Sequence, residues 1–109
     1  MIVYLAKHTN EEELKKAQTE FGDYIKVTVD IDKKVAVIGG QLHSDGEKVL
    51  LEEGSKQENI WGGGFDVKSG RVDTQAVINI RPSQNNDSME ILSSDIRKKF
   101  IKIAENFLK

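Results

Sequence analysis

The sequence contains no cysteine and no long apolar run, and each absence excludes a class of protein. Without cysteine the chain can form no disulfide, no thiolate nucleophile and no sulfur-ligated zinc site. A membrane-spanning helix needs roughly 18 consecutive apolar residues, and no stretch approaches that length. Residues 1–5 lack the basic region that begins a signal peptide. We therefore expect a cytoplasmic protein that does not associate with a membrane.

The chain also has little net charge. Its 16 basic and 18 acidic residues sum to −2, whereas proteins that bind duplex nucleic acid usually carry a clear positive excess. Nucleic acid is therefore not an expected partner. Hydrophobic residues make up 38% of the 109 residues, which is too apolar for a disordered chain and sufficient for one core. With no repeat and no linker, residues 1–109 are expected to form a single domain.

Apolar residues that alternate, or that recur at helical spacing, predict the secondary structure. Strands are expected at residues 2–5, 23–31, 35–38, 56–67 and 71–81, with 35–38 nearer the centre of the sheet than 23–31 because it is wholly apolar. A first helix should begin at the capping pair Thr9 and Glu12 and end at Gly22. A last helix should be capped by Ser93 or Ser94 and carry the apolar stripe Ile96, Phe100, Ile103 and Phe107.

Residues 44–53 fit two structures. Ser44 and Glu47 form a capping box for a helix of about two turns, which Gly54 would end. The alternative is a hairpin that turns at Asp45 and Gly46, and the helix is favoured. The element order is then β-α-β-β-(α)-β-β-α. It predicts an α+β fold, with a mixed or mainly antiparallel sheet of four to five strands and two to three helices packed on one face.

His43 opens the first polar segment. In an extended chain His43, Asp45 and Glu47 would project to one side, as three metal ligands could. A helix removes that geometry, the spacing matches no standard metal site, and His8 lies far away in the sequence. We therefore expect neither a metal nor a cofactor, and we interpret this segment mainly as a polar connection that caps the next element.

Trp61, the only tryptophan, is followed by three glycines at 62–64. An aromatic wall beside bare backbone could hold a flat ligand, but the favoured interpretation is that Trp61 fills the core and the glycines make room for it. The glycines match no phosphate-binding loop motif. Their position inside a predicted strand indicates a bulge or a close approach of another part of the chain.

Residues 79–90 are the more informative polar segment. Asn79 and Arg81 would share one face of the predicted strand 71–81, so that face must be polar or must bury paired polar groups. The guanidinium of Arg81 suits a carboxylate or a phosphate. Its partner could be Glu90, in an internal salt bridge, or an acidic group of a ligand.

Charge modifies both expectations. Residues 42–61 hold five acidic and two basic residues, a net −3, which suits a cation, an amine or a basic peptide better than a phosphate. The last helix is basic, with Arg97, Lys98, Lys99, Lys102 and Lys109. Such a face could touch RNA, but we expect it to be a solvated helix face.

Five short patterns are distributed along the chain: G-G-x-L-H-x-D at 39–45, L-L-E-x-G-S-x-Q at 50–57, W-G at 61–62, I-N-I-R-P at 78–82 and N-x-S-M-E-I at 86–91. Together they resemble one family of short bacterial and archaeal proteins, known only as a domain of unknown function. The resemblance spans nearly the whole chain and implies that these segments belong together, but it transfers no activity.

We therefore expect a small-ligand-binding or partner-binding domain whose polar site surrounds Arg81, where residues 43–47, Trp61 and 79–90 converge. One alternative is a small hydrolase-like enzyme that uses His43 or Glu90 as general acid or base. Another is a structural or assembly subunit. The sequence does not predict the oligomeric state. The candidate ligand-binding residues are His43, Asp45, Trp61, Asn79, Arg81, Asn86, Ser88 and Glu90.

Overall fold

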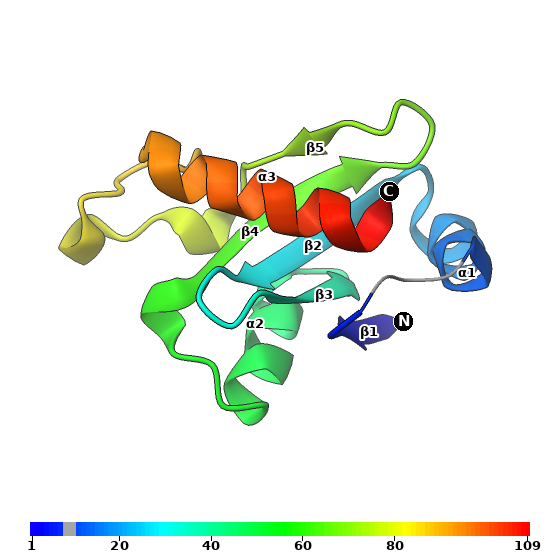
Figure 1. Ribbon diagram of the computed structural model, residues 1–109, viewed down its shortest axis with the longest axis horizontal. Coiled ribbons are helices and arrows are strands. Elements are labelled where there is room, and N and C mark those ends of the chain that lie inside the picture. The colour runs from blue at the N-terminus through cyan, green and yellow to red at the C-terminus, as the bar shows by residue number, and fades with distance from the viewer. Residues whose placement is uncertain (8–10) are drawn as a thin grey trace.

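The computed structural model describes residues 1–7 and 11–109, and in them a five-stranded antiparallel sheet is combined with three α-helices (Figure 1). This confirms the expected α+β fold. The predicted capping residue Thr9, like His8, lies outside the described residues. The strands are β1 (Ile2–Leu5), β2 (Tyr24–Asp30), β3 (Val35–Gly39), β4 (Ile60–Asp66) and β5 (Val72–Asp73), and the helices are α1 (Glu11–Phe21), α2 (His43–Glu52) and α3 (Ser94–Leu108).

The strands lie in the order β1-β3-β2-β4-β5, and every neighbouring pair is antiparallel. The middle strand is therefore β2, and the prediction that residues 35–38 lie nearer the centre than β2 is wrong. Both strands are interior. β2 pairs over its full length with β4, from Tyr24 opposite Asp66 to Asp30 opposite Ile60. In the middle of this half-polar strand Thr28 is buried, and Gly46 of α2 packs directly against it.

The helices pack on both faces of the sheet, not on one face as predicted. Figure 1 shows α3 in front of the sheet and α2 behind it. In front, Phe100 and Ile103 of α3 join a core with Val27 of β2. Behind, Leu50 of α2 packs with Val37 of β3 in a second, smaller cluster. β3 is apolar on both of its faces, so each face needs a cover.

Residues 44–53 form the favoured helix, and the hairpin alternative is wrong. α2 begins at His43, one residue earlier than the capping box predicted, and Asp45 replaces Ser44 and Glu47 as its capping side chain. The Asp45 Oδ2 atom accepts a hydrogen bond of 3.0 Å from the backbone N–H of Leu42. At α3 the prediction is confirmed, since Ser93 Oγ accepts a hydrogen bond from the N–H of Ile96.

The predicted strand 71–81 ends after two residues of β5. The chain then leaves the sheet, because the N–H of Ala76 donates to Met89 O and the N–H of Ile91 donates to Thr74 O. Two single-turn 3₁₀ helices follow, η2 (Val77–Asn79) and η3 (Pro82–Gln84). A third, η1 (Gln57–Asn59), occupies the start of the predicted strand 56–67.

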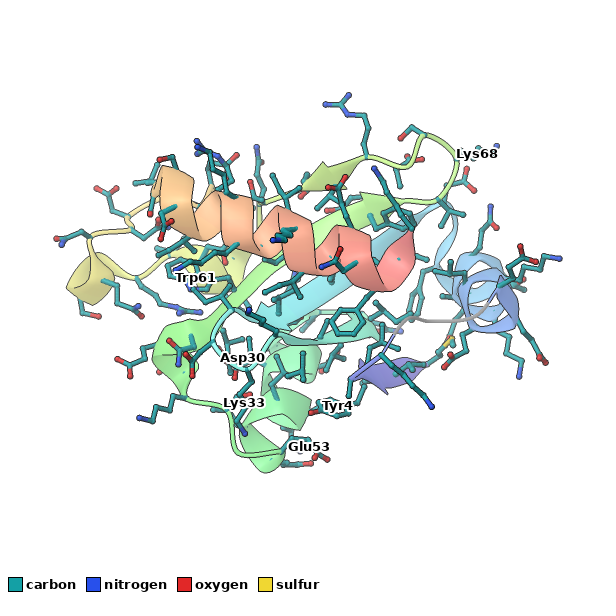
Figure 2. The ribbon with its side chains drawn as sticks, in the orientation of Figure 1. Tyr4, Asp30, Lys33, Glu53, Trp61 and Lys68 are labelled. Carbon is teal, nitrogen blue, oxygen red and sulfur yellow. The ribbon has the colours of Figure 1, made fainter. Side chains whose placement is uncertain are left out.

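The connection between β2 and β3 is held by Asp30, whose Oδ1 accepts hydrogen bonds of 2.9 Å from the N–H groups of Asp32 and Lys33. The turn ends at Lys34, which has a φ of +59° in the left-handed region. The Lys33 Nζ atom donates to Glu53 O at 3.1 Å, which ties this turn to the end of α2 (Figure 2). In the described residues no helix is both long and apolar enough to cross a membrane.

Candidate functional site

Side chains complete the outer edge of β4 where β5 stops. β5 pairs only with Gly64 and Phe65. At Gly62 the backbone N–H donates to Asn79 Oδ1 and the backbone oxygen accepts from Asn79 Nδ2, both at 2.9 Å. A carboxamide offers the same donor and acceptor as a peptide group. The Asn79 side chain therefore occupies the ladder position that a neighbouring strand would fill.

Arg81 takes the next position along the same edge, and its Nη2 donates to Ile60 O. The other three bonds of the guanidinium join it to Ile78 O at 3.0 Å, Gln57 O at 2.9 Å and Gln84 Oε1 at 3.3 Å. The guanidinium carbon lies 4.5 Å from the centre of the Trp61 ring, a cation–π contact. Burial lowers the pKa of Arg81, and the nearby Glu47 carboxylate opposes that shift.

Glu90 is not the partner of Arg81, so the predicted salt bridge between them is wrong. The Glu90 Oε1 atom accepts a hydrogen bond from Thr74 Oγ1 and another, of 2.8 Å, from the N–H of Ile91. The N–H of Glu90 itself donates to Ser88 Oγ at 3.1 Å. Glu90 and Ser88 thus fix the chain that runs beside residues 74–76.

We call residues 74–92 the 74–92 segment. The buried Asn86 joins its first part to its last part. Its Nδ2 lies 2.7 Å from Asn79 O and 3.0 Å from both Ser88 O and Glu90 O. Its Oδ1 accepts from the N–H of Leu92 at 2.8 Å. The polar side chains of this segment therefore satisfy the backbone of a stretch that has almost no regular secondary structure.

Trp61 belongs to the core, with 1% of its surface exposed (Figure 2). It cannot form the wall of an open ligand site. The glycines after it allow close approach: a Cβ at Gly62 would lie 2.7 Å from the Ala76 Cβ and 2.9 Å from the His43 Cδ2. The pairing of β4 with β2 is regular throughout, so close approach and not a bulge explains these glycines.

His43, the first residue of α2, is half-buried against β4. Its Nε2 lies 2.6 Å from Gly63 O, and because a carbonyl only accepts, Nε2 carries the proton. The pKa of His43 is lowered chiefly by burial, which disfavours the charged imidazolium. The hydrogen bond to Gly63 and the charge of Asp73 raise this pKa, and the charge of Lys26 lowers it. The ring is thus held as a neutral donor that fastens α2 to the sheet.

The lowered pKa of His43 predicts a loss of stability in mild acid. In the unfolded chain His43 takes up a proton as the pH falls below its ordinary pKa of 6.5, whereas the folded protein resists this protonation. The contribution of the neutral ring to folding stability is therefore complete above pH 6.5 and decreases as the pH falls below that value. His43→Gln keeps a side-chain donor for Gly63 O but does not titrate. Urea unfolding from about pH 7.5 to about pH 5.5 should show a steeper decline for the wild-type chain than for the variant. Parallel curves would contradict this role of His43.

The predicted residues do converge in space. His43, Trp61, Asn79 and Arg81 all lie at β4, and Asn86, Ser88 and Glu90 fix the 74–92 segment beside it. Asp45 lies apart from them at the start of α2. Most of their polar atoms bond to the protein's own backbone, so their predicted role in ligand binding stays a prediction.

The outer surface of the same segment was not predicted from the sequence. Val77, Ile80, Met89 and Leu92 all point to solvent there, with exposures of 67%, 46%, 44% and 48%. One feature of the sequence could have indicated it. If Asn79, Arg81 and Asn86 face inward, each needs hydrogen-bond partners inside the protein. With the polar side chains turned in, the apolar residues between them have to face out.

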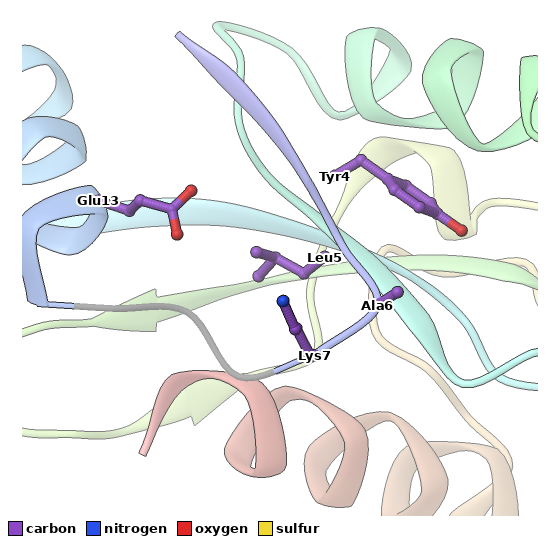
Figure 3. Close-up of a pocket in the computed structure, with 5 residues that line it drawn as sticks. All are labelled: Tyr4, Leu5, Ala6, Lys7 and Glu13. Carbon is purple, nitrogen blue, oxygen red and sulfur yellow. The ribbon is translucent and has the colours of Figure 1, made fainter.

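Surface cavities lie elsewhere. One of about 360 Å³, at the end of β1, is lined by Tyr4, Leu5, Ala6, Lys7 and Glu13 (Figure 3). Another of about 500 Å³ lies between the β2–β3 turn and α3. His43, Arg81 and Glu90 line neither of these nor three other cavities of residues 1–7 and 11–109. The same residues contain no cluster of three histidine or carboxylate side chains that could hold a metal ion.

The fold and this edge define a class of small antiparallel α+β domain in which an asparagine and an arginine side chain extend the sheet in place of a strand. A family model described as "Protein of unknown function (DUF5674)" matches residues 3–107, and the chain therefore belongs to that family. Comparisons with curated proteins and with solved structures found no match.

Proposed function

We propose that this protein is a partner-binding domain that recognises a polypeptide through the outer surface of the 74–92 segment. The observation that carries the proposal is the inverted polarity of the segment. Asn79, Arg81 and Asn86 are buried, whereas four large apolar side chains of the same stretch are exposed: Val77, Ile80, Met89 and Leu92. Large apolar side chains exposed on a surface are typical of interaction sites where they form one patch.

Rigidity supports the same proposal. Asn79 and Arg81 tie the first part of the segment to β4, and Asn86 ties its last part to its first part. A surface that is already ordered loses little conformational entropy when a partner binds, so more of its contact energy remains as affinity. Met89 can adapt its unbranched side chain to an irregular partner surface.

The charges nearby indicate the chemistry of the partner. Arg81 is buried, so the exposed charges of the 74–92 segment are Asp87 and the half-buried Glu90. Glu58 is also exposed, and its backbone oxygen accepts a hydrogen bond from Gln84. Arg97 of α3 also borders the segment, with its guanidinium donating to Ile91 O at 2.9 Å. Three carboxylates against this one guanidinium leave the surroundings net acidic, which is complementary to a polypeptide with apolar residues flanked by lysine or arginine.

This partner fits the site better than a small anion does. The guanidinium of Arg81 already makes four hydrogen bonds within the protein, so an acidic ligand would have to displace some of them. General acid or base chemistry by His43 or Glu90 lacks support as well, because neither side chain lines any of the five cavities described above.

Selection from a displayed library of random peptides tests the proposal. Peptides enriched on the full chain should combine apolar and basic residues, and Ile80→Thr should weaken their binding about tenfold, the usual loss when a central apolar contact is removed. The matched control is Ile2→Thr, because Ile2 is equally exposed at 45% and lies on β1 at the opposite edge of the sheet. Binding should survive that change.

Two results would overturn the proposal. One is that no peptide is enriched, or that Ile80→Thr and Ile2→Thr affect the enriched peptides equally. The other is concentration-dependent self-association in light scattering that Ile80→Thr abolishes. In that case the segment joins copies of this chain, and the protein is an assembly subunit.

A further inference from the structure

We propose that the groove between the β2–β3 turn and α3 binds a small molecule that carries a phosphate or polyphosphate group. The groove lies away from the 74–92 segment and encloses about 500 Å³, which is within the usual range for small-molecule sites. The turn contributes one wall and one face of α3 contributes the other. Its lining residues are Ile31, Asp32, Lys34, Lys99, Lys102, Ile103 and Asn106.

The charge of this groove is opposite in sign to that of the whole chain. Three lysines and one aspartate line it, a net +2, whereas the chain carries −2. Lys99 lies 3.2 Å from Asp95, one turn earlier on α3. Lys34 and Lys102 form no ion pair with any residue in the described part of the chain. At least two ammonium groups are therefore available to an anion.

Lys34 lies at a strained backbone position. The turn requires a left-handed residue there, with a φ of +59°, and Asp30 holds the turn in that form. Glycine adopts this conformation without strain, whereas a residue with a side chain does not. Backbone strain of this kind persists where the side chain has a task. Here the side chain brings one of the three ammonium groups to the groove.

The rest of the lining indicates the remainder of the ligand. Lysine acts as a point-charge binder of phosphate. Lys99 and Lys102 are three residues apart, and neighbours at that spacing lie together on one side of a helix. Ile31 and Ile103 supply apolar wall, and Asn106 offers an amide to a hydroxyl or amino group. A phosphorylated molecule with a flat or apolar body, such as a nucleotide, has this combination of groups.

Calorimetric titration of the full chain with ATP, pyrophosphate and adenosine tests the proposal. ATP and pyrophosphate should bind at low salt and weaken as salt is added, and adenosine should bind far less. Lys34→Gly and Lys102→Gln should each weaken ATP about fivefold, the factor for one unit-charge pair about 4 Å apart in water. Lys34→Gly also relieves the strained turn, so its thermal midpoint should not fall and unfolding cannot explain the loss.

Lys98→Gln is the control, because Lys98 is exposed on α3 and does not line the groove. The substitution changes the net charge by the same amount as Lys102→Gln. It should leave ATP affinity unchanged. The proposal fails if low-millimolar ATP does not bind at low salt, or if Lys98→Gln weakens ATP as much as Lys102→Gln does. It also fails if a short single-stranded DNA binds more tightly than ATP and responds to all three lysines, which would make the helix face a nucleic-acid surface.

Discussion

Asn79→Asp should destabilise the protein by about 4 kcal/mol, the usual loss when a buried charge is left without a counter-charge. The Asn79 Nδ2 group lies within 2.9 to 3.2 Å of three carbonyl oxygens, of Gly62, Thr74 and Met89. A carboxylate has no hydrogen to donate, so it would place its negative charge against all three. Its oxygens can still accept from the Gly62 N–H, so the expected loss comes from the donor side alone.

Urea unfolding at pH 7 measures this loss. Asn85→Asp is the matched control, since Asn85 is exposed, and its change should stay within about 0.5 kcal/mol. Lowering the pH toward about 3.9 should recover part of the Asn79→Asp loss, because a protonated carboxyl can donate and the folded state then binds more protons than the unfolded chain. A loss below about 1 kcal/mol would show that the carboxamide is not what holds this edge.

Gly63→Ala should be the most damaging of the single substitutions in the glycine triplet, with a loss of about 3 kcal/mol. The new methyl group would overlap the backbone oxygen of Asp73 and lie 2.8 Å from the Phe100 ring. Neither can yield locally, because Asp73 is in β5 and Phe100 is fully buried in the core. The strand or the helix would have to shift.

Gly64→Ala is the control for that result. Its methyl group would overlap the ring of Tyr24, but Tyr24 is 42% exposed and can rotate into solvent. Such a movement gives up the hydrogen bond to Asp73 that, after burial, raises the Tyr24 pKa. We expect a loss of about 1 kcal/mol, typical for one hydrogen bond. Thermal unfolding of both variants compares their losses of stability. Equal losses would mean that contact with the Asp73 backbone does not explain why residue 63 is glycine.

Most of the fold follows from the sequence because most of its elements bury one periodic apolar face. Ile25, Val27 and Val29 alternate in β2 as predicted, and Phe100 and Ile103 of α3 lie in the core. The same alternation misled at residues 76–80. Ala76 and Ile78 do turn inward, but Ile80 is 46% exposed. Periodicity predicts which side chains share a face of a strand. It does not predict that the side chains of Asn79 and Arg81 take the place of that strand beside β4.

The predicted residues converge beside β4, but the partner predicted for Arg81 is wrong, for a related reason. Arg81 was expected to meet Glu90 or a ligand, since those are the charges that the sequence displays. Its acceptors are instead the backbone oxygens of Gln57, Ile60 and Ile78, together with the Gln84 amide. Every residue carries such an oxygen, so no pattern of residue types distinguishes these three. Trp61 was correctly expected in the core, because a large ring beside three glycines is typical of tight packing.

The closed edge of β4 also limits how copies of this protein can misassemble. An unpaired strand edge invites another chain to add to the sheet, and repeated addition produces fibres. At Ile60 and Gly62 the outward backbone groups are already bonded to Arg81 and Asn79. An added strand would first have to displace two buried side chains. This part of the β4 edge, beyond the end of β5, is therefore protected from strand addition without a further strand or a row of surface charges.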